Sequence, residues 1–220
     1  MPAKTNTPSK ISRLTQAERS STTRERVCRA TLEALAEVGH DSISTTMIAH
    51  RANLSRGALT HQFPTRNDLL VAALRQLHDN WRNAPPVNLD PLETRLSMAD
   101  LTEVLWQNVF GDPHYLAAIE LMLAARLDTD LGRGLREEME SWVAHRDDRF
   151  FALLRMSPDC EEQRLLLRLT LSVLRGIAVH RSFDQSDTMA RQLVSLWQKM
   201  LRGSDVGLPR PMPDQEDRNA

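Results

Sequence analysis

Apolar residues recur along this chain at intervals of three and four positions, the spacing of one face of an α-helix. The pattern defines nine segments, at residues 22–38, 44–52, 55–63, 65–81, 92–110, 113–127, 131–156, 160–182 and 186–202. The alternating apolar and polar pattern that is typical of half-buried strands does not occur in the sequence. The sequence therefore predicts an all-α fold with about nine helices in total.

Helix-capping residues mark the ends of the short helices in the N-terminal third. Ser44 or Thr45 is placed to cap the second helix, and Ser55 and Thr65 are placed to cap the third and the fourth. Asn53 lies in the turn between the second and third helices, where Asn tolerates the left-handed conformation. We therefore expect a helix, a tight turn and a second short helix in this part of the chain.

Breaks between the helices divide the chain into two domains. Gly39 supplies a stop signal after the first helix, and Gly132 separates two of the later ones. Residues 83–91 are rich in Pro and Asn and are interpreted as an internal linker. The sequence thus predicts a helix-turn-helix domain with its connecting helix at 19–82 and a larger helical domain at 92–203.

Both ends of the chain are predicted to be disordered, because they are polar and lack helical periodicity. Residues 1–18 contain Lys4, Lys10 and Arg13 and form either a basic arm along DNA or a solvated tail. Residues 204–220 form a charged, proline-containing tail.

The formal net charge of −1 is unevenly distributed along the chain. Residues 1–82 carry a net charge of +5, and residues 83–220 carry a net charge of −6. A basic N-terminal part on an acidic body suits a protein whose N-terminal domain meets a polyanion, and a chance asymmetry is the alternative.

The helix-turn-helix at residues 44–63 is the segment with the clearest functional meaning. Such a unit presents its second helix to the major groove of DNA while the first helix braces it across the backbone. A helical hairpin without a DNA role has the same outline. Leu59 and Phe63 are spaced to anchor the second helix inward, which leaves its polar residues exposed and favours DNA binding.

The outward-facing residues of this unit have side chains suited to DNA. Arg56 suits a bidentate contact to guanine, and Gln62 or Thr60 can reach a base or a phosphate. Arg66 opposes the helix dipole in the first turn of the fourth helix, which a phosphate partner would explain. The ten residues predicted to contact DNA are Thr45, Thr46, Ser55, Arg56, Gly57, Ala58, Thr60, His61, Gln62 and Arg66.

Several short motifs in this region resemble the DNA-binding domain of TetR-family repressors over roughly residues 22–80. They are Thr45-Thr46-Met47-Ile48-Ala49, Ala52-Asn53-Leu54-Ser55-Arg56-Gly57-Ala58-Leu59, Phe63-Pro64-Thr65-Arg66 and Leu69-Leu70. The family usually has Gly, Tyr, His and Lys where this chain has Asn53, Thr60, Gln62 and Arg66. These departures bear on the operator sequence and on affinity.

The resemblance implies a homodimer in which the last two helices of each chain form a four-helix bundle. The stripes of these helices fit such a bundle, and the alternative is ordinary packing within one chain. The residues predicted at the dimer interface are Leu166, Leu169, Val173, Gly176, Ile177, His180, Met189, Leu193, Leu196, Trp197 and Met200.

The resemblance also implies a pocket for a small-molecule effector within the middle helices. Aromatic and Met side chains with a few polar groups suit an apolar or amphipathic ligand, and for each single residue core packing is the more common role. The predicted lining residues are Trp106, Phe110, Tyr115, Met122, Trp142, His145 and Phe151.

Other classes of function have little support in the sequence. It contains no HExxH motif, no glycine-rich phosphate loop and no nucleophile elbow, so we expect neither an enzyme nor a metal or cofactor site. Two distant cysteines, no apolar run long enough to span a membrane and no signal peptide favour a cytoplasmic protein.

We therefore expect a sequence-specific DNA-binding regulator, a repressor that a small ligand releases from operator DNA. The fourth helix joins the two domains and is expected to transmit the ligand signal. One alternative is a DNA-binding regulator without an inducer. Another is a helical enzyme with a vestigial DNA motif, for which the sequence offers no catalytic group.

Overall fold

The computed structural model describes residues 16–184 and 187–203, and within these ranges every regular element is helical. The elements are α1 (Gln16–Ser42), α2 (Thr45–Arg51), α3 (Arg56–Gln62), α4 (Arg66–Arg82), α5 (Met98–Leu105), the π-helical turn η1 (Trp106–Phe110), α6 (His114–Ala124), α7 (Thr129–Leu154), α8 (Glu161–Arg181) and α9 (Asp187–Gly203). The predicted all-α fold is confirmed for this part of the chain. The basic arm predicted at 1–18 lies largely outside the described residues, and the tail at 204–220 lies wholly outside them.

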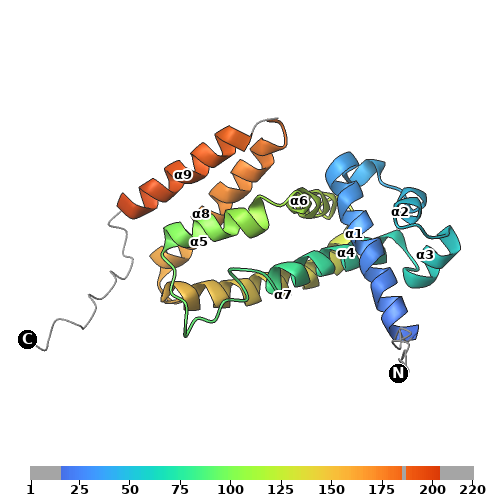
Figure 1. Ribbon diagram of the computed structural model, residues 1–220, viewed down its shortest axis with the longest axis horizontal. Coiled ribbons are helices and arrows are strands. Elements are labelled where there is room, and N and C mark those ends of the chain that lie inside the picture. Colours follow the sequence, from blue (N-terminus) through green and yellow to red (C-terminus); the bar gives the residue numbers. More distant parts are fainter. Residues whose placement is uncertain (1–15, 185–186, 204–220) are drawn as a thin grey trace, which may run out of the picture.

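The molecule is elongated, with α2 and α3 at one end and α8 and α9 at the other (Figure 1). Helix α4 runs from the helix-turn-helix into the body, where it packs against α1 and α7. Its residues Leu69, Leu70, Leu74 and Leu77 are all buried. Helix α4 therefore contributes to the core of both parts of the molecule. None of the described helices is both long and apolar enough to cross a membrane.

The caps expected around the helix-turn-helix are present. The hydroxyls of Ser44, Ser55 and Thr65 each accept a hydrogen bond from the backbone N–H three residues later, at 3.2, 3.1 and 3.0 Å. Thr65 and Asp68 also form a reciprocal capping box. Asn53 adopts a φ of 52°, the left-handed conformation that the turn requires. Side-chain chemistry thus determines where α2, α3 and α4 begin.

A polar junction joins α1 and α4 to α6. Arg66 donates to the carbonyl of His40 at 2.6 Å, and its other terminal nitrogen lies 3.0 Å from His40 Nε2. The backbone N–H of His40 donates to the Glu120 carboxylate at 3.0 Å. The prediction that Gly39 ends the first helix is wrong in part. Gly39 breaks the helix with a φ of 73°, but helical residues resume and reach Ser42.

Two other predicted helix ends are wrong. Residues 92–97 are not helical, because Ser97 and Asp100 form a capping box that starts α5 one residue after Ser97. Gly132 does not separate two helices but lies in the first turn of α7. A Cβ at Gly132 would stand 2.7 Å from the carbonyl oxygen of Ala125, so this glycine permits close packing against the end of α6.

Candidate DNA interface and ligand pocket

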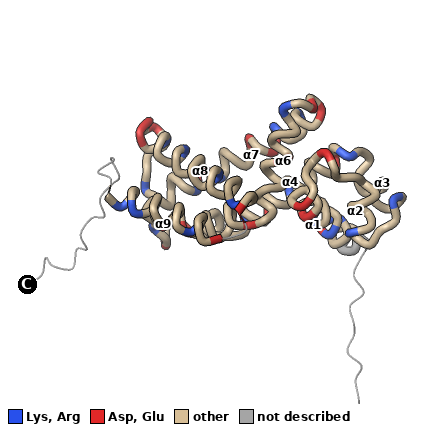
Figure 2. The backbone as a smooth tube through the Cα atoms, turned by 90° about the horizontal axis from the view of Figure 1, so that it is seen from above, with Lys and Arg blue, Asp and Glu red and all other residues tan. Residues whose placement is uncertain are grey.

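Helix α3 presents a polar surface at one end of the molecule. Ser55, Arg56, Gly57, Ala58, Thr60 and His61 are all exposed. The side chains of Arg56 and His61 form no hydrogen bond or ion pair with the other described residues. Thr46 is exposed and Thr45 is half-buried at the start of α2. The same end of the tube carries Lys and Arg segments and lies far from α9 (Figure 2).

Four of the residues predicted to contact DNA already have partners within the protein, and one of them is Ser55, which caps α3. The Thr60 hydroxyl donates to the carbonyl of Arg56 at 3.0 Å, and the Gln62 amide donates to Ser20 at 3.3 Å. Arg66 faces His40 at the junction with α1. This bond to a carbonyl explains a cation at the start of α4 without a phosphate, so a DNA contact by Arg66 stays a prediction.

The orientation of α3 is set by two buried anchors and one cation. Leu59 and Phe63 are 1% and 3% exposed, as their spacing predicted. The guanidinium of Arg24, on α1, lies 4.4 Å from the centre of the Phe63 ring and donates to the carbonyl of Gln62 at 3.3 Å. Sequence reasoning missed Arg24, because no local pattern connects it to residues almost 40 positions later.

A small, mostly apolar pocket is lined by residues of α4, α5, η1, α6, α7 and α8. Its volume is about 40 Å³, which is room for a few water molecules. Four aromatic residues, Trp81, Phe110, Tyr115 and Trp142, form much of its wall. The ring centres of Trp81 and Trp142 are 5.5 Å apart, and those of Phe110 and Tyr115 are 4.7 Å apart. The pocket is thus nearly closed by its own side chains.

A buried charge cluster adjoins this pocket on α4 and α7. His78 Nδ1 lies 2.9 Å from Glu138 Oε1, and its ring stacks on Trp142. Arg75 donates to Glu138 at 3.0 Å, and Arg82 lies 3.7 Å away. Burial lowers the pKa of His78 despite the adjacent carboxylate. Burial also opposes ionisation of Glu138, but the hydrogen bonds from His78 and Arg75 outweigh it and lower the Glu138 pKa.

The structure brings four of the seven predicted pocket residues together. Phe110, Tyr115, Met122 and Trp142 all line the pocket. The prediction for His145 is wrong, because this residue lies on the exposed side of α7. The prediction for Phe151 is also wrong, because its neighbour Phe150 occupies the inward position.

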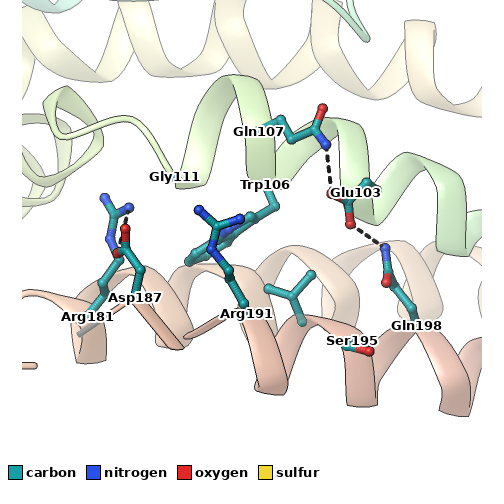
Figure 3. Close-up of a pocket in the computed structure, with 10 residues that line it drawn as sticks. Glu103, Trp106, Gln107, Gly111, Arg181, Asp187, Arg191, Ser195 and Gln198 are labelled. Atoms are coloured by element: carbon teal, nitrogen blue, oxygen red, sulfur yellow. Dashed lines mark hydrogen bonds and ion pairs between the residues drawn. The ribbon is translucent and has the colours of Figure 1, made fainter. Parts of the chain in front are cut away.

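The seventh residue, Trp106, lines a different cleft of about 450 Å³ between η1 and α9 (Figure 3). Several polar groups of this cleft are paired with one another, whereas Arg191, which also lines it, has no side-chain partner among the described residues. Glu103 accepts hydrogen bonds from Gln107 at 2.7 Å and from Gln198 at 2.8 Å, and Arg181 lies 3.7 Å from Asp187. Trp106 thus lies apart from the other predicted pocket residues, and its contact with a ligand stays a prediction.

Sequence reasoning missed five polar or aromatic residues of the pocket, one of which is Phe150. His78 and Trp81 lie on α4, three positions apart, where they continue the apolar face of the connecting helix. That spacing was a usable signal, but it indicated core of the DNA-binding domain. Arg146 and Arg175 also line the pocket, and charged residues in long amphipathic helices normally indicate a solvated face.

An apolar surface runs along α8 and α9. Its large side chains, which are 47–58% exposed, are Leu165, Leu169, Met189, Leu196 and Met200. All but Leu165 were predicted at the dimer interface. Five clustered large apolar side chains of this kind are typical of an interaction surface.

The other predicted interface residues lie in different environments. The prediction for Ile177 is wrong, because this residue is 7% exposed and points into the core of its own chain. Four more residues are partly buried against that core, namely Leu166, Val173, Leu193 and Trp197. Gly176 and His180 are exposed, and a Cβ at Gly176 would meet nothing within 4 Å. The packing that would explain a glycine there is absent from the described part of one chain.

The cysteines and acidic residues suggest no further chemistry. Burial raises the pKa of the Cys28 thiol to about 11, so Cys28 stays a protonated, unreactive core residue. Within the described residues, no group of three or more His, Cys, Asp or Glu side chains is arranged to hold a metal ion.

Comparison with known proteins agrees with this architecture. Residues 27–73 match the model of the bacterial regulatory proteins of the tetR family. The chain is 39% identical over 196 residues to the HTH-type transcriptional regulator BetI of Escherichia coli O157:H7, covering 86% of each protein. It is 29% identical over 178 residues to the HTH-type transcriptional regulator CymR of Pseudomonas putida, covering 80% of this chain and 86% of CymR.

A solved structure extends the likeness over the whole body. The multidrug binding protein EbrR in complex with ethidium superposes with a TM-score of 0.55 at 25% identity, covering 81% of this chain and 98% of EbrR. The extent of the BetI match, together with the helix-turn-helix geometry, shows the family. The chain belongs to the TetR family and is a DNA-binding transcriptional regulator.

Proposed function

We propose that this protein is a dimeric repressor that reads operator DNA with α3 and that a small apolar or amphipathic ligand releases it from DNA. The observation that carries the DNA-reading part is the exposed side chain of Arg56, which has no partner among the described residues, on a helix whose opposite face is anchored by buried residues. A guanidinium in that position is suited to the acceptor pair of guanine in the major groove.

The proposed dimer rests on the apolar surface of α8 and α9. A second copy that covers Leu169, Leu196 and Met200 would remove large apolar side chains from water, and a two-fold axis would place the same surface of both chains in contact. Gly176 would then lie where a helix of the partner can approach closely. The two α3 helices of such a dimer would enter successive major grooves, about 34–36 Å apart.

The proposed ligand release rests on the aromatic pocket and on α4. Trp81 and His78 line the pocket near the end of the same helix whose first residue, Arg66, holds the junction to α1. A ligand that enters the pocket must displace side chains of α4, because the present volume of about 40 Å³ is too small for it. The complex of EbrR with ethidium shows that a related fold accepts a planar aromatic ligand.

The same small volume favours a second candidate, a DNA-binding regulator with no small-molecule inducer. The two candidates differ in one observable. An inducible repressor binds a small molecule with an affinity that operator DNA lowers, whereas a regulator without an inducer shows no such ligand.

Operator binding tests the proposal. Sites selected from random DNA by the full-length protein are titrated with wild type, Arg56→Ala and the control Arg133→Ala, which removes an exposed arginine of α7. Loss of a base contact by Arg56→Ala is expected to cost about 1–3 kcal/mol and to relax the sequence preference. Equal affinity and equal preference for wild type and Arg56→Ala would contradict the assignment of α3.

A further inference from the structure

The aromatic pocket contains a hydrogen-bond donor without an acceptor. Trp81 is 4% exposed, and its indole nitrogen Nε1 has no hydrogen-bond partner among the described residues. A buried N–H without a partner costs about 1–3 kcal/mol, so such a group calls for an explanation. Trp81 lines the pocket, and a bound acceptor atom would remove this cost.

The nearby polar groups are also donors. Arg175 Nε donates to the hydroxyl oxygen of Tyr115 at 3.1 Å, and this leaves the Tyr115 proton available for another acceptor. Burial raises the pKa of Tyr115 despite the nearby cations Arg175 and Arg146, so the hydroxyl stays protonated at neutral pH. The pocket therefore presents an indole N–H, a phenol O–H and a guanidinium from three different helices.

The carboxylates near the pocket are already engaged. Glu138, which binds the lining residue His78, also has Arg75 and Arg82 around it. Asp147 accepts two hydrogen bonds from Arg146, at 2.9 and 2.7 Å. Arg175, by contrast, forms no ion pair with any described residue, and its one described partner is the neutral Tyr115. The pocket thus has a guanidinium without a carboxylate partner among the described residues. The lining residue His78 donates through Nδ1 to Glu138, so its Nε2 is an acceptor on the same wall.

We propose that the ligand of this pocket is a small aromatic carboxylate, with its ring against Trp81, Trp142 and Phe110 and its carboxylate bound by Arg175, Tyr115 and the Trp81 N–H. This inference rests on the proposed function, in which the pocket binds an effector. A carboxylate supplies the acceptors that the three donors lack and pairs with the unpaired guanidinium. An aromatic cation could stack on the same rings, but the positive charge of Arg175 would repel it.

An outer groove lies beside the pocket, between α4, α6 and α7. Met122 and Met139 line the pocket and also line this groove, whose volume is about 540 Å³. These two side chains therefore form the wall between the groove and the pocket. Methionine has three rotatable bonds and repacks readily, so this wall can open without a break in either helix.

Calorimetric titration of the full-length protein tests the ligand class. Three probes of matched shape are used: 2-naphthoate, 2-naphthamide and 2-naphthylmethylammonium. We expect 2-naphthoate to bind at least about tenfold more tightly than either of the others, a difference of about 1.4 kcal/mol. In ¹⁵N-edited spectra, the indole N–H signal of Trp81 is assigned as the one that is absent from Trp81→Phe. In the wild-type protein this signal is expected to shift when 2-naphthoate binds and to shift less with the ammonium probe.

Variants of the binding residues give the matched control. Arg175→Gln is expected to weaken the binding of 2-naphthoate by about tenfold or more, whereas the affinity for 2-naphthamide should change by less than about twofold. Arg175→Lys, which keeps the charge, is expected to retain part of the preference, and Arg133→Gln on the exposed side of α7 is expected to change neither. Circular dichroism confirms that each variant is folded.

Three outcomes would overturn the proposed ligand class. They are tighter binding of the ammonium probe, equal binding of the acid and the amide, and no binding of any probe at millimolar concentration. Operator binding by the same preparation is a separate readout. If 2-naphthoate does not bind, the proposed ligand class is wrong but operator recognition by α3 is unaffected. If the wild-type protein binds no selected operator, the proposed function itself is contradicted.

Discussion

Replacement of Gly134 by Ala is expected to disturb the contact between α7 and α4. A Cβ at Gly134 would stand 2.9 Å from Cγ2 of Val71, a separation that requires either the Val71 side chain to leave its rotamer or one of the helices to shift. Alanine is favoured over glycine in a helix by about 1 kcal/mol. Overpacking of this kind costs about 1–3 kcal/mol, so Gly134→Ala should lower the free energy of unfolding by up to about 2 kcal/mol.

Removal of the Val71 methyl groups should reverse the sign of the change in stability that Gly134→Ala causes. In a Val71→Ala background the Gly134→Ala change should stabilise the protein by up to about 1 kcal/mol, which gives a coupling energy of about 1–3 kcal/mol. Gly57→Ala is the matched control, because a Cβ there meets nothing within 4 Å. The assay is urea denaturation followed by circular dichroism at a fixed protein concentration. Stabilisation by Gly134→Ala in the wild-type background would refute the close approach of α4 and α7.

Three further changes test other parts of the molecule. Burial lowers the pKa of His78, so near pH 6.5 the unfolded chain binds a proton at this residue and the folded chain does not. The free energy of unfolding should therefore fall as the pH drops below the ordinary pKa of 6.5, by at most about 1.4 kcal/mol per pH unit. His78→Gln should lessen this fall in denaturation curves measured from pH 7.5 to 5.5, and a wild-type advantage that grows at low pH would contradict it. Ser55→Ala removes the cap of α3 and should destabilise this helix by about 1 kcal/mol, which corresponds to about fivefold weaker operator binding. Backbone amides of α3 should also exchange faster with solvent, and unchanged exchange would show that the cap is dispensable. Leu169→Glu should produce monomers by analytical ultracentrifugation, and an intact dimer would exclude this surface as the interface.

The helix-turn-helix was predictable because its signals are local. Each cap lies three residues from its partner, and Asn53 needs only its own backbone preference to form the turn. The inward spacing of Leu59 and Phe63 is likewise a property of one short helix. Local chemistry therefore predicted both the position of α3 and the face that it exposes.

The pocket was predicted only in part because residues of several helices form it, from α4 to α8. A helical repeat places a residue on a face, but the neighbouring helices decide whether that face meets core, cavity or solvent. Phe150 and Phe151 show the difficulty, since adjacent positions in α7 have equal hydrophobicity and only the inner one lines the pocket. Arg175 shows the same difficulty for a charged residue. The sequence does not reveal that its partner is the hydroxyl of Tyr115, 60 positions earlier.

The junction of Arg66, His40 and Glu120 was also beyond sequence reasoning. Its bonds connect α4 to the end of α1 and α1 to α6, across separations of 26 and 80 residues. A cation at the start of a helix suggested a phosphate, because the helix dipole was the only interaction visible in the sequence. The carbonyl of His40 supplies an internal alternative that depends on the kink at Gly39.

The most direct test of ligand-gated DNA binding is the affinity of the full-length protein for its selected operator with and without 2-naphthoate. Fluorescence anisotropy of labelled operator is measured at a probe concentration that calorimetry shows to saturate the pocket. The proposed mechanism predicts weaker operator binding, by the same factor by which operator DNA weakens binding of the probe. An operator affinity that stays the same while the pocket is fully occupied would contradict it.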